Sequence, residues 1–160
     1  MEQSMHTVFL SLGSNLGDRE ANLMGAIDKI KNRIGPIREQ SDFFVTNPEG
    51  FESDNLFLNA ALKVETALTP DNLLLATQAI ERELGREQKS VNGIYHDRPI
   101  DIDILLIDDL QIDTPSLTVP HPRMLDRLFV LQPLAQIAPT LTVPGTNCQI
   151  SQLLARRQEA

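Results

Sequence analysis

The order of strand-like and helix-like segments is the feature that most constrains how this chain folds. Two segments carry apolar residues at helical spacing: Leu23, Ile27, Ile30 and Ile34 in the first, and Leu73, Leu74, Ala76, Thr77, Ile80 and Leu84 in the second. Strand-like segments lie at about residues 7–12, 37–46, 57–66 and 99–107. The resulting order, β-α-β-β-α-β, is typical of a ferredoxin-like α+β fold, in which an antiparallel sheet carries both helices on one face.

The ends of both helices have recognisable signals. The first is predicted to begin after Asp18 as N-cap and to end near Arg33, before a Gly-Pro pair. The second is predicted to begin after Thr69, with Pro70 at its first position. Gly85 stands where a C-terminal capping glycine belongs.

The last third of the chain follows this pattern as an extension. It contains an extended segment at 117–120, a helical stretch near 133–137 and a terminal helix near 150–157. A length of 160 residues fits one domain. We therefore expect a single domain over residues 1–160, with a ferredoxin-like core at about 7–108 and an extension at 109–160.

Charge and composition exclude several classes of partner. The formal net charge is −8, which argues against non-specific nucleic-acid binding. The N-terminus lacks the features of a signal peptide, and no apolar run approaches the roughly 18 residues of a membrane span. We expect a cytoplasmic monomer without nucleic-acid or membrane partners, and a small anionic ligand would need only a local basic cluster.

Two aspartates in the last predicted strand are the sharpest candidates for chemistry. Strand side chains alternate, so Asp101 and Asp103 point to one face while Ile102 and Ile104 point into the core. Neighbouring carboxylates repel each other, and Mg²⁺ held by one or two carboxylates plus substrate phosphates would compensate. A solvated strand face, with Arg98 as partner, explains the same pattern without a metal.

Other features are weaker when each is taken alone. The turn at 13–17 follows a strand and precedes a helix, but its glycine spacing matches neither standard phosphate-binding motif, so it is interpreted as a structural turn. Cationic side chains lie beyond the second helix and in the extension, where each is also compatible with solvated surface: Arg86, Lys89, Arg98, His121, Arg123 and Arg127. The polar segment 87–97 between Arg86 and Arg98 is long for a connection, and we expect it to be a lid.

Several motifs occur in an order that is specific as a set. They are GSNLGD (13–18), FLNAA (57–61), Glu81 with Gly85 and Arg86, RPIDIDIL (98–105), VPHP (119–122) and RLFVLQPL (127–134). In this order and spacing they resemble the 6-hydroxymethyl-7,8-dihydropterin pyrophosphokinase family, and the resemblance covers nearly the whole chain.

The resemblance implies roles for individual residues. Asp101 and Asp103 would bind two Mg²⁺ ions and, with Arg86 and Arg98, form the catalytic group. The residues implied to bind ATP are Gln78, Glu81, Arg86, Lys89, Arg98, Ile102, Ile104, His121 and Arg127. Those implied to bind the pterin are Thr46, Phe57, Asn59 and Phe129. The loop that contains Lys89 has fewer arginines than in familiar members and lacks their tryptophan. Either Lys89 or His96 is expected to supply the missing charge, and Tyr95 the missing aromatic ring.

The implied reaction is a step of folate biosynthesis. The hydroxymethyl oxygen of the pterin attacks the β-phosphorus of ATP, AMP leaves, and the pterin carries the diphosphate. Such a transfer asks the protein mainly for positioning and charge neutralisation. Two other classes stay open at this point: a non-catalytic ferredoxin-like ligand-binding domain, and an enzyme that transfers the nucleotidyl group and releases diphosphate.

Overall fold

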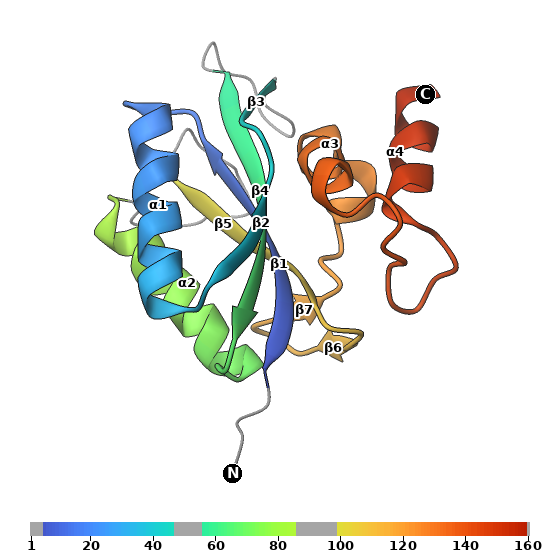
Figure 1. The fold of residues 1–160 in the computed structure, drawn as a ribbon, viewed down its shortest axis with the longest axis horizontal. Helices are drawn as coiled ribbons and strands as arrows, with labels where there is room; N and C mark the ends of the chain where they lie inside the picture. Colours follow the sequence, from blue (N-terminus) through green and yellow to red (C-terminus); the bar gives the residue numbers. More distant parts are fainter. Residues whose placement is uncertain (1–4, 47–55, 86–98, 160) are drawn as a thin grey trace.

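An antiparallel five-stranded sheet lies at the centre of the protein (Figure 1). The structure is a computed structural model that describes residues 5–46, 56–85 and 99–159. The strands run in the order β2-β4-β1-β5, with β3 pairing beside β2 along β4. Their bounds are His6–Ser14 for β1, Ile37–Gln40 for β2, Phe44–Thr46 for β3, Phe57–Thr66 for β4 and Asp101–Ile107 for β5. This confirms the predicted ferredoxin-like α+β class.

Helices α1 (Arg19–Arg33) and α2 (Pro70–Glu83) cover one face of this sheet (Figure 1). The predicted caps are confirmed. The Asp18 side chain accepts a hydrogen bond from the backbone of Ala21, and the Thr69 side chain accepts one from Asn72. Gly85 follows α2 with φ +100°, a left-handed conformation that favours glycine. Local capping chemistry therefore fixes where these helices begin and end.

The prediction of one continuous strand over 37–46 was wrong, because Ser41 interrupts it. The backbone N–H of Ser41 bonds to the carbonyl of Ala61, but its hydroxyl, not a carbonyl, accepts the return bond from the Ala61 N–H at 2.8 Å. The hydroxyl itself donates to the Asp42 carbonyl. A side chain thus replaces a backbone group in the ladder, and the strand divides into β2 and β3.

On the opposite face of the sheet, helix α3 (Leu128–Ile137) of the extension packs against β4, and helix α4 (Ile150–Glu159) packs against the outer side of α3 (Figure 1). A short 3-10 helix, η1 (Met124–Asp126), precedes them, and strands β6 (Ile112–Asp113) and β7 (Thr118–Val119) pair separately. The sheet therefore separates two buried apolar clusters, one under α1 and α2 and one under α3 and α4. Helix α3 begins earlier than predicted, since Pro133 lies within it and not at its start.

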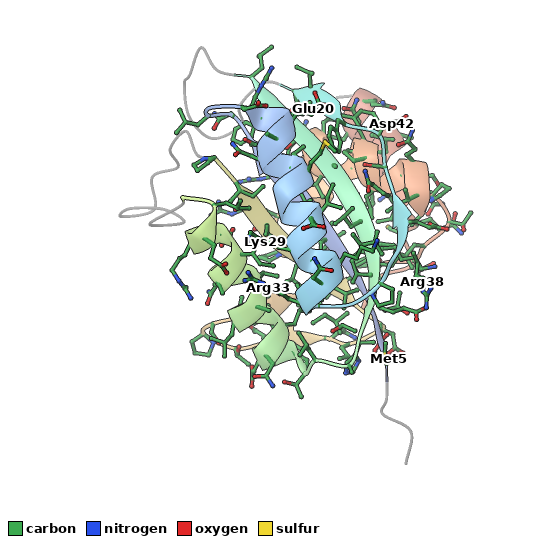
Figure 2. All side chains as sticks on the ribbon, turned by 60° about the vertical axis from the view of Figure 1, so that its left-hand side comes forward. Met5, Glu20, Lys29, Arg33, Arg38 and Asp42 are labelled. Carbon is green, nitrogen blue, oxygen red and sulfur yellow. The ribbon has the colours of Figure 1, made fainter. Side chains whose placement is uncertain are left out.

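Contacts on the surface join elements that are distant in sequence. Glu83 of α2 accepts hydrogen bonds from both terminal nitrogens of Arg33 in α1, and Lys29 lies 3.5 Å from the same carboxylate. Figure 2 labels Lys29 and Arg33 on α1. The bond from Arg33 is the main reason that the pKa of Glu83 is lowered to about 2. The side-chain carboxylate of Asp42 accepts a hydrogen bond from the side-chain nitrogen of Gln136 at 2.7 Å, and the backbone N–H of Asp42 donates to the side-chain oxygen of Gln136 at 2.6 Å. These two bonds connect the β2–β3 segment to α3. No described helix combines the length and apolar character that crossing a membrane requires.

Candidate functional site

The register of three central strands brings the predicted pterin and metal residues to one face of the sheet. Strand β1 lies between β4 and β5, and Gly13 of β1 pairs with Asn59 on one side and with Asp101 on the other. Directly opposed residues in antiparallel strands present their side chains on the same face. Asn59 and Asp101 therefore lie on the side covered by α3, two strand spacings or about 10 Å apart at the backbone.

The pterin residues predicted from the sequence lie together at the β4 end of this row. Asn59 is 1% exposed, and its side-chain nitrogen donates a hydrogen bond to the Thr46 hydroxyl of β3. The rings of Phe57 on β4 and Phe129 on α3 are parallel to within 11°, with centroids 6.4 Å apart. The site thus combines a buried, oriented amide with two parallel aromatic rings, which suits a flat polar heterocycle.

Arg127, which the sequence analysis predicts to bind ATP, lies against one ring of this aromatic pair. Its guanidinium carbon lies 5.4 Å from the centroid of the Phe129 ring, within the range of a cation–π contact. Arg127 immediately precedes α3, and its carbonyl accepts backbone hydrogen bonds from the first turn of that helix. The cation is therefore held beside the ring that the sequence analysis predicts to bind the pterin.

The two aspartates occupy alternate positions of β5, as the sequence predicted. Ile102 and Ile104 are buried in the core, at 2% and 5% exposure, whereas Asp101 and Asp103 remain partly exposed. The Asp103 carboxylate lies 3.9 Å from Nε2 of His121. The backbone N–H of His121 donates to the Leu105 carbonyl at 2.9 Å, which fixes this segment against the end of β5.

The hydrogen bonding of His121 defines the role of each ring nitrogen. Its Nδ1 accepts a bond from the backbone N–H of Arg123 at 3.2 Å. In the neutral ring the proton must then be on Nε2, the atom that faces Asp103. His121 consequently presents a donor, and not an acceptor, to the space beside the aspartate.

A pocket of about 260 Å³ opens along the outer edge of β5. It contains Asp103 together with four of the residues predicted to bind ATP: Gln78, Ile102, Ile104 and His121. Sequence reasoning missed Leu74, which lies on α2 with Gln78, and the other wall, which is formed by Pro115, Ser116, Leu117, Thr118 and Pro122. The extended character of 117–120 was recognisable, but nothing local in the sequence indicated that this segment lies opposite α2.

Glu81 has a different position from the other predicted ATP residues. Its side chain is 5% exposed, and its carboxylate accepts the backbone N–H of Ile102 at 2.8 Å. Ile102 lies between the two aspartates. Glu81 therefore holds the outer edge of β5 against α2 at the position where both carboxylates are presented.

Replacing Glu81 with leucine should impair catalysis through the position of β5. The change leaves the buried Ile102 N–H without its acceptor, at a cost of about 1–3 kcal/mol. We expect a lower thermal midpoint and a higher Mg²⁺ concentration for half-maximal rate. Glu81→Gln retains an acceptor oxygen and should restore most of both properties. Equal losses in the two variants would instead indicate that the negative charge is required, as in a direct contact with the substrate.

Mg²⁺ prefers oxygen ligands. On β5 these are supplied by two carboxylates at alternate positions, Asp101 and Asp103. No group of three or more histidine, cysteine, aspartate or glutamate side chains in residues 5–46, 56–85 and 99–159 is arranged to hold a metal. This donor set fits an ion completed by substrate phosphates better than a closed structural site. Arg86, Lys89 and Arg98, and the predicted lid at 87–97, lie outside the described residues.

Comparison with known proteins assigns the chain to a family. The sequence model of the 7,8-dihydro-6-hydroxymethylpterin-pyrophosphokinase (HPPK) family matches residues 9–139. A 2-amino-4-hydroxy-6-hydroxymethyldihydropteridine pyrophosphokinase of Porphyromonas gingivalis is 51% identical over 138 residues, covering 86% of this chain and 94% of the relative. The enzyme of the same name from Bacillus subtilis is 41% identical over 145 residues, covering 90% of this chain and 85% of the relative.

Solved structures agree at the level of the fold. The crystal structure of Plasmodium falciparum HPPK-DHPS wild type with SDX-DHP superposes with a TM-score of 0.76 at 15% identity. The alignment covers 97% of this chain but 45% of that longer chain. With the match to the family over most of its length, the chain belongs to the 7,8-dihydro-6-hydroxymethylpterin-pyrophosphokinase family.

Proposed function

We propose that this protein transfers the terminal diphosphate of ATP to the hydroxymethyl oxygen of 6-hydroxymethyl-7,8-dihydropterin in folate biosynthesis. Membership of the family supports the reaction. The observation that supports this assignment of the site is the row Asn59–Gly13–Asp101: the amide that we assign to the pterin and a carboxylate that we assign to Mg²⁺ lie on one face with a single strand between them. A pterin held at one end of this row would direct its hydroxymethyl group towards phosphates held at the other.

The pterin end would recognise shape and hydrogen-bonding pattern together. Asn59 donates one amide hydrogen to Thr46, and its carbonyl oxygen and second amide hydrogen would meet the edge of the heterocycle. Phe57 and Phe129 would contact the flat ring system. Because Asn59 is buried, a pterin that failed to pair with it would leave polar groups unsatisfied, and this favours the correct substrate.

The nucleotide would occupy the pocket along the outer edge of β5. The N–H of Ile102 points outward to Glu81, so the N–H of Ile104, two residues further along, faces the same edge. This outer edge of β5 would offer backbone groups to the edge of a purine, while Gln78 and His121 line the same pocket. The phosphates would then lie next to Asp103 and within reach of the His121 Nε2 proton.

Asp101 and Asp103 would hold Mg²⁺, for which we expect two ions. When bound, the ions neutralise phosphate charge and align the β-phosphorus for in-line attack. The protein's own contribution would come from cationic and donor groups that stabilise charge on the phosphate oxygens: Arg86, Lys89, Arg98, His121 and Arg127. A loose transition state lessens the need for a dedicated general base. We also propose that the protein is a cytoplasmic monomer that binds neither nucleic acid nor membranes.

Identification of the products tests the proposed function. Purified protein with ATP, Mg²⁺ and 6-hydroxymethyl-7,8-dihydropterin should form AMP and the pterin diphosphate in equal amounts, as measured by chromatography. AMP formation should require the pterin. Release of diphosphate with a nucleotidyl pterin would instead establish nucleotidyl transfer, and binding of both ligands without turnover would favour a non-catalytic domain.

A further inference from the structure

We propose that Gly13 is a positioning residue of the reaction centre, and that its lack of a side chain holds the Asn59 amide in the orientation that receives the pterin. This inference rests on the proposed function for its effect on the substrate. The turn that begins at Gly13 is interpreted from the sequence as structural, and its glycines lack the spacing of a phosphate loop. Its place in the sheet gives this glycine a further role.

The backbone gives no reason for a glycine at this position. The glycines with positive φ are Gly17, Gly35, Gly85 and Gly145 among the described residues, and Gly13 is not one of them. Glycine weakens a strand, and where it occurs it usually marks a bulge, a bend or the close approach of another group. The pairing of β1 with β4 is regular through Gly13, and the irregularity in its pairing with β5 lies between Phe9 and Leu10. Close approach of another group is the explanation that remains.

The group that approaches is the side chain of Asn59. A Cβ atom at position 13 would lie 2.8 Å from Oδ1 of Asn59 and 3.4 Å from Cδ1 of Phe57. The first distance is shorter than real Cβ contacts permit. The amide cannot turn aside freely, because Asn59 is buried and its nitrogen donates to Thr46. A methyl group at position 13 therefore forces the amide out of the orientation in which it bonds to Thr46.

The effect should fall on the pterin and not on ATP. Both side chains nearest to the added Cβ, Asn59 and Phe57, belong to the pterin end of the row. Asp101 also pairs with Gly13, but no atom of it is among the three nearest, which extend to 3.8 Å. Gly13 is therefore predicted to act on substrate recognition through its neighbours, while the metal and nucleotide end stays intact.

The test compares Gly13→Ala with the control Gly25→Ala in the full chain. Gly25 lies in α1, where an added Cβ makes only an ordinary contact of 3.5 Å with Leu84. We expect Gly13→Ala to raise the KM for the pterin about tenfold, equivalent to the loss of one good hydrogen bond to the substrate, and to leave the KM for ATP within about twofold. Gly25→Ala should leave both values unchanged. An unchanged pterin KM, or equal rises in both KM values, would overturn the proposal.

A double-mutant cycle with Asn59→Ala keeps the inference testable if Gly13→Ala folds poorly or if the proposed function fails. Asn59→Ala removes the atom that the new methyl group meets. The fall in thermal midpoint that Gly13→Ala causes in the wild-type protein should therefore be much smaller when the same substitution is made in the Asn59→Ala variant, and this comparison needs no substrate. Strictly additive losses would overturn the steric coupling. Absence of pterin-dependent AMP formation in the wild-type protein, with the coupling intact, would refute the proposed function alone.

Discussion

Replacing either Asp101 or Asp103 with alanine should abolish turnover while the protein stays folded. Each change removes one of the two adjacent carboxylates that we assign to Mg²⁺. Loss of metal-assisted charge stabilisation is worth several kcal/mol, and each 1.4 kcal/mol is tenfold, so we expect a decrease of about 10³-fold or more in the rate of AMP formation. Neither carboxylate is part of the two apolar clusters, so the thermal midpoint should be maintained or should rise as like-charge repulsion is relieved.

The control for this experiment is Asp109→Ala. Asp109 is exposed and lies two residues beyond the end of β5, so its replacement changes the net charge equally without touching the site. It should turn over at the wild-type rate. Activity close to normal in Asp101→Ala or Asp103→Ala would refute the assignment of the metal site. A large fall in the thermal midpoint would show that the carboxylates support the fold, and the loss of rate could not then be assigned to metal binding.

The parts of the fold that local chemistry determines were predictable from the sequence. Asp18, Thr69 and Gly85 mark helix ends through bonds or backbone conformations that involve only near neighbours. Ser41 shows the limit of this approach. Its residue type is compatible with a strand, and the strand ends there only because its hydroxyl faces the Ala61 N–H of another strand. A hydrogen bond in which a side-chain hydroxyl replaces a backbone carbonyl cannot be predicted without knowing how the two strands are paired.

The candidate site divides in the same way. Alternation along one strand predicted that Asp101 and Asp103 share a face, and that part needs no tertiary information. The adjacency of Asn59, Gly13 and Asp101 depends instead on the strand order β4-β1-β5 and on the register of both pairings. From the sequence alone, Gly13 was therefore interpreted only as part of a structural turn. Its contact with Asn59 arises from pairing between residues 46 positions apart, which no local pattern encodes.

Removing the Asn59 amide or the Phe129 ring, which we assign to the pterin, should weaken pterin binding more than ATP binding. Asn59→Ala removes a buried group that can both donate and accept, and Phe129→Ala removes a stacking surface. Losses of about 1–3 kcal/mol are typical for stacking of a flat base on an aromatic ring, so we expect the affinity for the pterin to fall about 10- to 100-fold. Calorimetry with the pterin and, separately, with a non-hydrolysable ATP analogue measures both affinities.

The two variants should differ in their effect on the nucleotide. Asn59 has no described contact with the predicted ATP residues, so Asn59→Ala should leave affinity for the ATP analogue unchanged. Phe129 supports Arg127 through the cation–π contact, and its loss should also reduce ATP affinity, by about twofold to fivefold for a contact worth roughly 0.5–1 kcal/mol. Val45→Ala is a suitable control because Val45 is 59% exposed on β3, beside Thr46. If the main loss in Asn59→Ala fell on the ATP analogue, the pterin would have to bind elsewhere than at Asn59, Thr46 and the aromatic pair.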